Sequence, residues 1–170
     1  MAEAGANVAL IYNTSKDAET TAATIASENS VRAAAYKADV VDQQGIENAV
    51  QKIDANFGKL DIIVVNSGIT SSIAAEDYIA AQWRDIMKVN LDGAFYSAQA
   101  AARTFKKQGF GNVIFTASVS ATLVNVPQKQ AAVRLPCKRL NDCTVPLTAT
   151  VQCFQSRRGP NGQMSIGGMG

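Results

Sequence analysis

Residues 58–68 read Gly-Lys-Leu-Asp-Ile-Ile-Val-Val-Asn-Ser-Gly, and this stretch decides the fold. Its centre, residues 62–65, contains only β-branched residues, which predicts a strand covered on both faces, as in parallel sheets. Gly58 is typical of a residue that ends the preceding helix. The strand is followed at once by small residues, 66–68, which let a backbone approach a ligand closely, although they can also form an ordinary turn.

The alternation of apolar strand and amphipathic helix continues on both sides of this stretch. We expect strands at residues 8–12, 31–37, 62–65 and 113–115. We expect helices over about residues 16–28, 46–57 and 80–108. This order, with short connections and right-handed crossovers, predicts an α/β fold in which a doubly wound, Rossmann-like parallel sheet carries helices on both faces.

Two details of these helices are also expected. The first should begin at a capping box formed by residues 14–17. The long helix over residues 80–108 should place one apolar stripe on one side, consisting of Leu91, Ala94, Phe95, Ala98 and Phe105.

Composition excludes several kinds of function. The net charge of +2 is too small to predict binding to nucleic acid or to a membrane surface. No apolar run reaches the roughly 18 residues that span a bilayer, and residues 1–7 lack the basic and apolar parts of a signal peptide. The chain has no histidine, and its three cysteines match no metal-binding or redox spacing. We therefore expect a cytoplasmic protein with reduced thiols and no metal site.

The character of the sequence changes near Val133. From there on, five basic residues accompany a single acid, Asp142, so this part carries a charge of +4 and residues 1–132 carry −2. Hydrophobic periodicity stops at the same point, and three prolines would interrupt a helix. We expect residues 1–132 to form one α/β domain and residues 133–170 to form an irregular or disordered tail.

Ligands of parallel sheets bind beyond the carboxyl ends of the strands. The first strand is followed by Asn13, Ser15 and Lys16, and no acid occurs before Asp17. A dinucleotide fold that selects NAD usually places a carboxylate here for the ribose hydroxyls, whereas small polar groups and a lysine tolerate a 2′-phosphate. These residues therefore favour NADP, and the alternative is an ordinary polar turn and helix cap.

The second strand is followed by Asp39 and Val40. By default these residues form a helix cap or a turn, and in a dinucleotide fold they would contact the adenine. Asn66, after the third strand, has an amide that can bridge neighbouring strands.

Together these segments resemble the short-chain dehydrogenase/reductase family. Residues 58–68 resemble its G-x-x-D-x-x-V-x-N-A-G segment, with Asn66 and Gly68 in place and serine where alanine is usual. Residues 89–93, Val-Asn-Leu-Asp-Gly, resemble its V-N-L-x-G block. Residues 115–118, Phe-Thr-Ala-Ser, match the strand that carries its catalytic serine.

The resemblance implies specific roles for two residues. Ser118 would hydrogen-bond the substrate carbonyl, and Asn90 would support a water in the proton relay of the family. Without the resemblance, Ser118 could simply cap its strand and Asn90 could be a polar kink in a long helix. Ser120 is the runner-up for the serine, because it follows the same strand.

A closer resemblance is to fungal NADP-dependent mannitol dehydrogenases and sorbose (L-xylulose-type) reductases. Residues 124–130, Val-Asn-Val-Pro-Gln-Lys-Gln, resemble their segment just before the catalytic tyrosine, and the resemblance extends from Met1 to about Ala132. It implies that residues 1–132 are a partial NADP-binding Rossmann-like domain that takes NADP(H) and a small carbonyl or polyol substrate. It also implies a homo-oligomer formed through the helix around residues 80–108.

Two parts of the family pattern are absent. The first strand and its T-G-x-x-x-G-x-G loop, which cradles the pyrophosphate, have no counterpart, and residues 1–5 resemble the end of the helix after that loop. The family's Y-x-x-x-K would begin at Val133 and place its lysine at Cys137; Lys138 is one residue late, and Pro136 forbids a regular helix there. A retained intron, a frameshift or a mispredicted gene model would each produce such a change.

The functional expectation has two forms. The lineage implies NADP(H)-dependent reduction of a ketose or other carbonyl to a polyol or alcohol, with weak cofactor binding and impaired or lost activity in this chain. The alternative is a non-catalytic remnant or pseudoenzyme that acts by association with related subunits. A flavodoxin- or receiver-like domain is a third possibility, but a receiver would need acidic residues clustered at its first strand. The missing central strand also predicts an exposed hydrophobic sheet edge and marginal stability.

Overall fold

The computed structural model describes residues 1–71, 73, 75–118, 152–158 and 164–167. Its strands are β1 (Val8–Tyr12), β2 (Ala33–Lys37), β3 (Ile62–Val65), β4 (Asn112–Ser118), β5 (Gln152–Arg158) and β6 (Met164–Gly167). Its α-helices are α1 (Ala18–Asn29), α2 (Gln43–Phe57), α3 (Ala80–Met87) and α4 (Gly93–Gln108). Two short 3₁₀ helices, η1 (Ala2–Ala4) and η2 (Ala75–Asp77), and a π-helical turn, η3 (Lys88–Asp92), complete the set.

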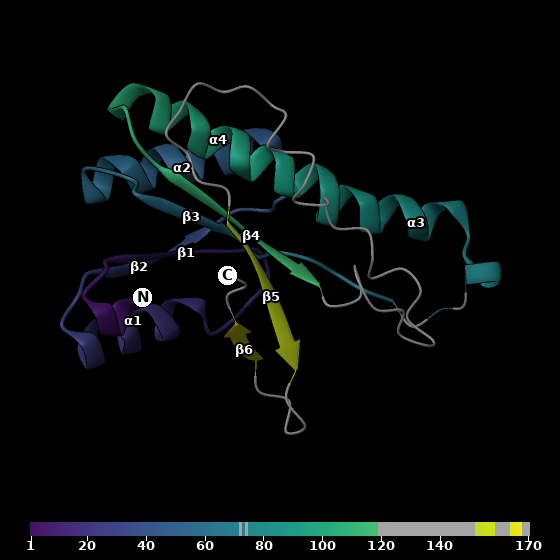
Figure 1. Ribbon diagram of the computed structural model, residues 1–170, viewed down its shortest axis with the longest axis horizontal. Helices are drawn as coiled ribbons and strands as arrows, with labels where there is room; N and C mark the ends of the chain where they lie inside the picture. Colours follow the sequence, from purple (N-terminus) through teal and green to yellow (C-terminus); the bar gives the residue numbers. More distant parts are fainter. Residues whose placement is uncertain (72, 74, 119–151, 159–163, 168–170) are drawn as a thin grey trace.

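The predicted Rossmann-like alternation of strands and helices is confirmed. The helices α2 and α4 lie on one side of the strands and pack against each other, whereas α1 lies on the other side (Figure 1). Gly58 ends α2 in the left-handed conformation, with φ of 82°, as the sequence predicts. The predicted capping box at residues 14–17 is wrong: α1 begins later, at Ala18, and its N-cap Asp17 makes no side-chain cap bond.

The strands form two sheets rather than one. In the first sheet β1 and β2 are parallel, with Val8 opposite Ala33. In the second sheet β3, β4 and β5 are parallel and β6 is antiparallel to β5. The expected single sheet is interrupted because β1 and β3 lie on opposite walls of a hollow and do not pair.

The expectation that β3 is covered on both faces is wrong. Val65 is buried, but Ile62 and Val64 are 39% and 42% exposed. Because side chains alternate along a strand, α4 covers only the face that carries Ile63 and Val65. The main core lies on that face, where Ala101 and Phe105 of α4 meet β3 and β4.

The predicted long helix consists of α3 and α4, joined through the wider turn of η3. Ala94 and Phe105 are buried as predicted, but Phe95 is 51% exposed, so its place in the buried stripe is wrong. The buried positions of α4 also include the small polar residues Ser97 and Thr104, which an apolar stripe does not reveal.

Two segments of residues 133–170, where no regular element is expected, are the strands β5 and β6. The strand β5 is parallel to β4 and pairs with the edge of β4 that lies away from β3. Several positions of the sequence argument lie outside the described residues: 124–130, Val133, Pro136, Cys137 and Lys138.

Candidate functional site

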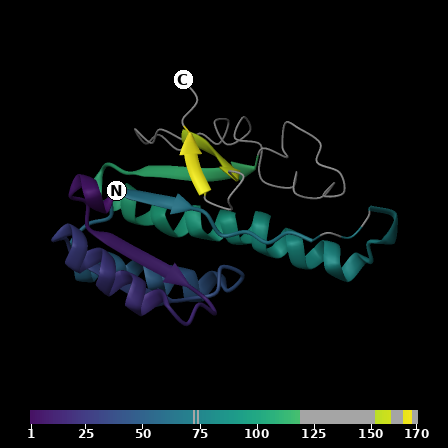
Figure 2. The ribbon, with the colours of Figure 1, turned by 90° about the horizontal axis from the view of Figure 1, so that it is seen from below.

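The carboxyl ends of the parallel strands carry most of the predicted site residues. The arrows of β1 and β3 point the same way although the two strands belong to different sheets (Figure 2). The predicted residues follow or end these strands: Asn13, Ser15 and Lys16 after β1, Asp39 and Val40 after β2, Asn66 and Gly68 after β3, and Ser118 at the end of β4.

The ends of β1 and β2 are held together by the backbone, since the amide of Ala38 donates to the carbonyl of Tyr12 at 2.8 Å. Beyond this point the side chains of Asn13, Ser15 and Lys16 are exposed. Within the described part of the chain none of the three forms a hydrogen bond or an ion pair through its side chain. Two polar groups and one cation are therefore available to a ligand.

The turn after β2 is shaped by its own residues. Oδ1 of Asp39 accepts a hydrogen bond from the amide of Val41 at 3.1 Å, which is the turn role that the sequence allows. Val40 lies against the start of α4, where a Cβ on Gly93 would come within 2.9 Å of the valine Cγ2. Gly93 therefore permits a close approach of α4 to the end of β2, a contact that the sequence argument did not assign.

Asn90 lies in η3 and is only 5% exposed. Its Oδ1 accepts a hydrogen bond from the amide of Ile69 at 2.8 Å, and its Nδ2 donates to the carbonyl of Ile69 at 2.9 Å. The carboxamide thus binds both backbone groups of one residue, as a neighbouring strand would. These two hydrogen bonds connect the loop after β3 to η3, which joins α3 and α4.

A small cavity of about 10 Å³ lies beside Asn90, lined also by Ser67 and by Phe115 and Thr116 of β4. A cavity of this size has room for about one water molecule. The cavity brings together the end of β3, the carboxyl half of β4 and the helix junction. Ser118 lies two residues further along β4, with its backbone opposite Ser156 of β5. Its side chain and Ser120 lie outside the described residues.

A much larger hollow, of about 630 Å³, lies between β1 and β3. It reaches the candidate site, because Val40, Asn66, Ser67 and Gly93 are among its lining residues. Sequence reasoning did not identify this hollow. It also missed Ile69, which bonds to Asn90 through its backbone amide and carbonyl, so the residue type gives no indication of that role. Gly93 did leave a signal, since it ends the Val-Asn-Leu-Asp-Gly segment.

Among the described residues, no group of three histidine, cysteine, aspartate or glutamate side chains is placed to hold a metal ion. In the same ranges, no helix combines the length and the apolar character needed to cross a membrane.

The chain is similar to known proteins in sequence and in structure. The family model of the short chain dehydrogenases matches residues 1–131. A probable NADP-dependent mannitol dehydrogenase of Yarrowia lipolytica is 41% identical over 132 residues, covering 76% of this chain and 47% of that protein. A sorbose reductase of Candida albicans is 38% identical over 132 residues, with the same two coverages. The chain therefore spans about half the length of these relatives.

Among solved structures, an NADPH-dependent 3-quinuclidinone reductase from Rhodotorula rubra is similar to this chain. The TM-score is 0.75 at 33% sequence identity, and the match covers 89% of this chain and 60% of the reductase.

Proposed function

The chain belongs to the short-chain dehydrogenase family, an oxidoreductase family, and from this membership we propose that it derives from an NADP(H)-dependent reductase of a ketose or related carbonyl. The names of the Yarrowia and Candida relatives, a mannitol dehydrogenase and a sorbose reductase, support a polyol or alcohol as the product. The observation that carries the proposal is the position of Asn90, whose bonds to Ile69 hold the loop after β3 beside the end of β4. We also propose a cytosolic location.

We assign the cofactor to the carboxyl edge of the strands. Asn13, Ser15 and Lys16 fit the 2′-phosphate of NADP(H), since their side chains are exposed and have no partners within the described residues. A lysine there adds a positive charge, and no acid lies between the end of β1 and Asp17 to repel a phosphate. When bound, NADPH supplies the hydride of the reaction.

The remaining cofactor contacts lie toward the large hollow. Asp39 and Val40 would flank the adenine, with Asp39 already held in its turn by the bond to Val41. Asn66 and Gly68 would lie beside the rest of the dinucleotide, at the mouth of the hollow, where Asn66 is a lining residue. Small residues in this loop let its backbone come close to a ligand.

Near the substrate we assign Ser118 to the carbonyl oxygen, because it lies at the carboxyl end of β4. We assign Asn90 a positioning role, in which it holds the loop after β3 and does not contact the substrate itself. Both ends of its carboxamide are already bonded to Ile69, so it keeps residues 66–69 in place next to the cavity of one water.

We further propose that activity is impaired in this chain. The tyrosine and lysine of the family's Y-x-x-x-K are replaced by Val133 and Cys137, and valine has no proton to give. Loss of a general acid costs about 10²–10⁴-fold in rate. Residues 1–170 contain no counterpart of the glycine loop, so we expect a polypeptide limited to these residues to bind the cofactor weakly.

The test is NADPH oxidation with fructose or sorbose as the substrate. A matched version of the chain carries the family's glycine loop and its Y-x-x-x-K segment in addition. We expect turnover from the extended version and at least about 100-fold less from this chain. Equal rates would refute the impairment, and a well-folded extended version with no activity on either sugar would refute the substrate class.

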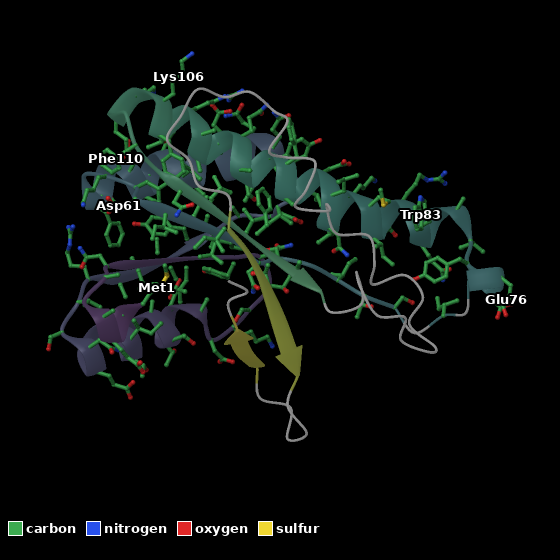
Figure 3. All side chains as sticks on the ribbon, in the orientation of Figure 1. Met1, Asp61, Glu76, Trp83, Lys106 and Phe110 are labelled. Carbon is green, nitrogen blue, oxygen red and sulfur yellow. The ribbon has the colours of Figure 1, made fainter. Side chains whose placement is uncertain are left out.

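A second candidate function is association with related subunits without catalysis. The observation that favours it is the exposure of large apolar side chains along the α3–α4 region: Ile79, Trp83 and Phe95. Trp83 lies far from the Asp61 and Phe110 end of the molecule (Figure 3). Size-exclusion chromatography, alone and with a full-length relative, tests this, since a chain that neither dimerises nor joins the relative would exclude it.

A further inference from the structure

Gly93 lies at the point where the π-helical turn η3 passes into α4. Its amide donates to the carbonyl of Lys88, and this bond closes the wide turn that contains Asn90. Its carbonyl accepts a hydrogen bond from the buried hydroxyl of Ser97 at 2.8 Å. Because both backbone groups of Gly93 are bonded in this way, a displacement of Gly93 is passed on to η3.

The side chain of Val40, in the turn after β2, lies against Gly93. A Cβ added at Gly93 would come within 2.9 Å of the valine Cγ2, 3.0 Å of its Cβ and 3.2 Å of its carbonyl oxygen. Val40 also packs against the core cluster of Ile46, Val50 and Ala100, so it has little room to retreat. The half-buried valine is therefore held between this cluster and the α-carbon of Gly93.

The contact between Val40 and Gly93 is too close to admit a side chain. Nonbonded carbon atoms prefer a separation of about 3.5–4.0 Å, so a Cβ added at Gly93 would push α4 and the valine apart by roughly 0.6–1.1 Å. The bonds between Asn90 and Ile69 are 2.8 and 2.9 Å long, and such bonds are lost by about 3.6 Å. Asn90 belongs to the turn that Gly93 closes, so a shift of this size is large enough to break them.

We infer that Gly93 is a positioning residue: the absence of a side chain lets Val40 hold η3, and with it Asn90, in the place where Asn90 binds Ile69. The consequence for ligands rests on the proposed function, in which Val40 flanks the adenine of the cofactor. A ligand that restricts Val40 then also restricts the loop after β3, through Gly93 and η3. The adenine end of the cofactor site is thus coupled to the loop beside the substrate end.

The first test exchanges the sizes of residues 40 and 93 and follows hydrogen exchange in the complete 170-residue chain. Gly93→Ala overfills the contact and Val40→Ala leaves a gap in it. Each should speed exchange of the Ile69 amide at least about fivefold relative to the amides of α1, which lies on the other side of the strands (Figure 1). In the double variant the added methyl group fills the gap, so this relative rate should return to within about twofold of the original.

Gly45→Ala is the matched control. Gly45 is also a helical glycine, but its added Cβ would meet the side chain of Asp42, the N-cap of its own helix α2. The relative exchange rate of Ile69 should not change in this variant. Equal acceleration of the Ile69 and α1 amides in Gly93→Ala would mean that the glycine serves overall packing alone, and would overturn the inference. Should Gly93→Ala fail to fold, exchange as fast in the double variant as in Val40→Ala would overturn it as well.

The second test uses 2′,5′-ADP, which carries the adenine but lacks the nicotinamide half of NADP(H). Bound 2′,5′-ADP should slow exchange of the Ile69 amide at least about threefold. Gly93→Ala should weaken its binding at least about fivefold in calorimetry, whereas Gly45→Ala should not. Binding with no effect on Ile69 would overturn the inferred coupling. If the unmodified chain did not bind 2′,5′-ADP, the proposed cofactor site would be refuted instead, and the size exchange would still decide the role of Gly93.

Discussion

Replacement of Asn90 by alanine should release the loop after β3 and lower the free energy of unfolding by about 2 kcal/mol. The carboxamide makes two hydrogen bonds, of 2.8 and 2.9 Å, both to the backbone of Ile69. A net contribution of about 1 kcal/mol for each bond gives the estimate. Ile69 is itself 45% exposed, so water can partly replace the lost partners and keep the cost near this value.

The assay combines urea unfolding, followed by circular dichroism and by the fluorescence of the single tryptophan, Trp83, with hydrogen exchange of the loop. A loss of 2 kcal/mol corresponds to about a 30-fold faster exchange of the Ile69 amide, if the bond to Asn90 controls its opening. The exchange of amides within α2 should change only as far as global stability does.

Ser97→Ala is the matched control. Ser97 is buried on α4, and its hydroxyl donates to the carbonyl of Gly93 at 2.8 Å. Removal of that hydroxyl leaves no backbone group unpaired, so we expect a change below about 0.5 kcal/mol. If Asn90→Ala also changed stability by less than 0.5 kcal/mol, and the Ile69 amide exchanged at its original rate, the positioning role of Asn90 would be refuted.

The remaining predictions concern packing, cofactor preference and overall stability. Gly111→Ala should cost about 1–3 kcal/mol, because its Cβ would lie 2.0 Å from the Phe105 ring, and an unchanged urea midpoint would contradict this. Phe105→Ala should cost about 3–5 kcal/mol, since the ring is almost wholly buried between α4 and the sheet; chemical unfolding or loss of soluble protein would report it. Lys16→Ala should weaken 2′,5′-ADP binding up to about fivefold and leave 5′-AMP unaffected, as measured by calorimetry; equal effects on both would argue against a 2′-phosphate site. The chain alone should melt below about 45 °C, because among the described strands none pairs with the second edge of β1 or of β3, and a sharp, reversible melt above the mesophile range in calorimetry would disprove it.

The family pattern and the elements could be predicted from sequence because they depend on near neighbours in the chain. The β-branched run of residues 62–65 forms β3 at the predicted bounds, and Gly58 ends α2 because glycine adopts positive φ without steric cost. The position of Asn66 at a strand end follows from the same local order. These features need no knowledge of which elements are adjacent in space.

Other features depend on contacts between distant parts of the chain. The composition of β3 predicts burial on both faces, yet Ile62 and Val64 are exposed because α4 packs only on the opposite face, which carries Ile63 and Val65. Likewise, Phe95 follows Ala94 by one residue, and only the direction from which β3 and β4 approach α4 decides which of the two is buried.

Sequence by itself determined the α/β class, the family and the edge of the sheet on which the candidate site lies. The tertiary structure alone decided the partner of Asn90, the approach of Gly93 to Val40 and the division of the strands into two sheets around a hollow. The physical reason is that helix and strand periodicity is encoded within a few residues, whereas a hydrogen bond between residues 21 positions apart exists only once the chain has packed.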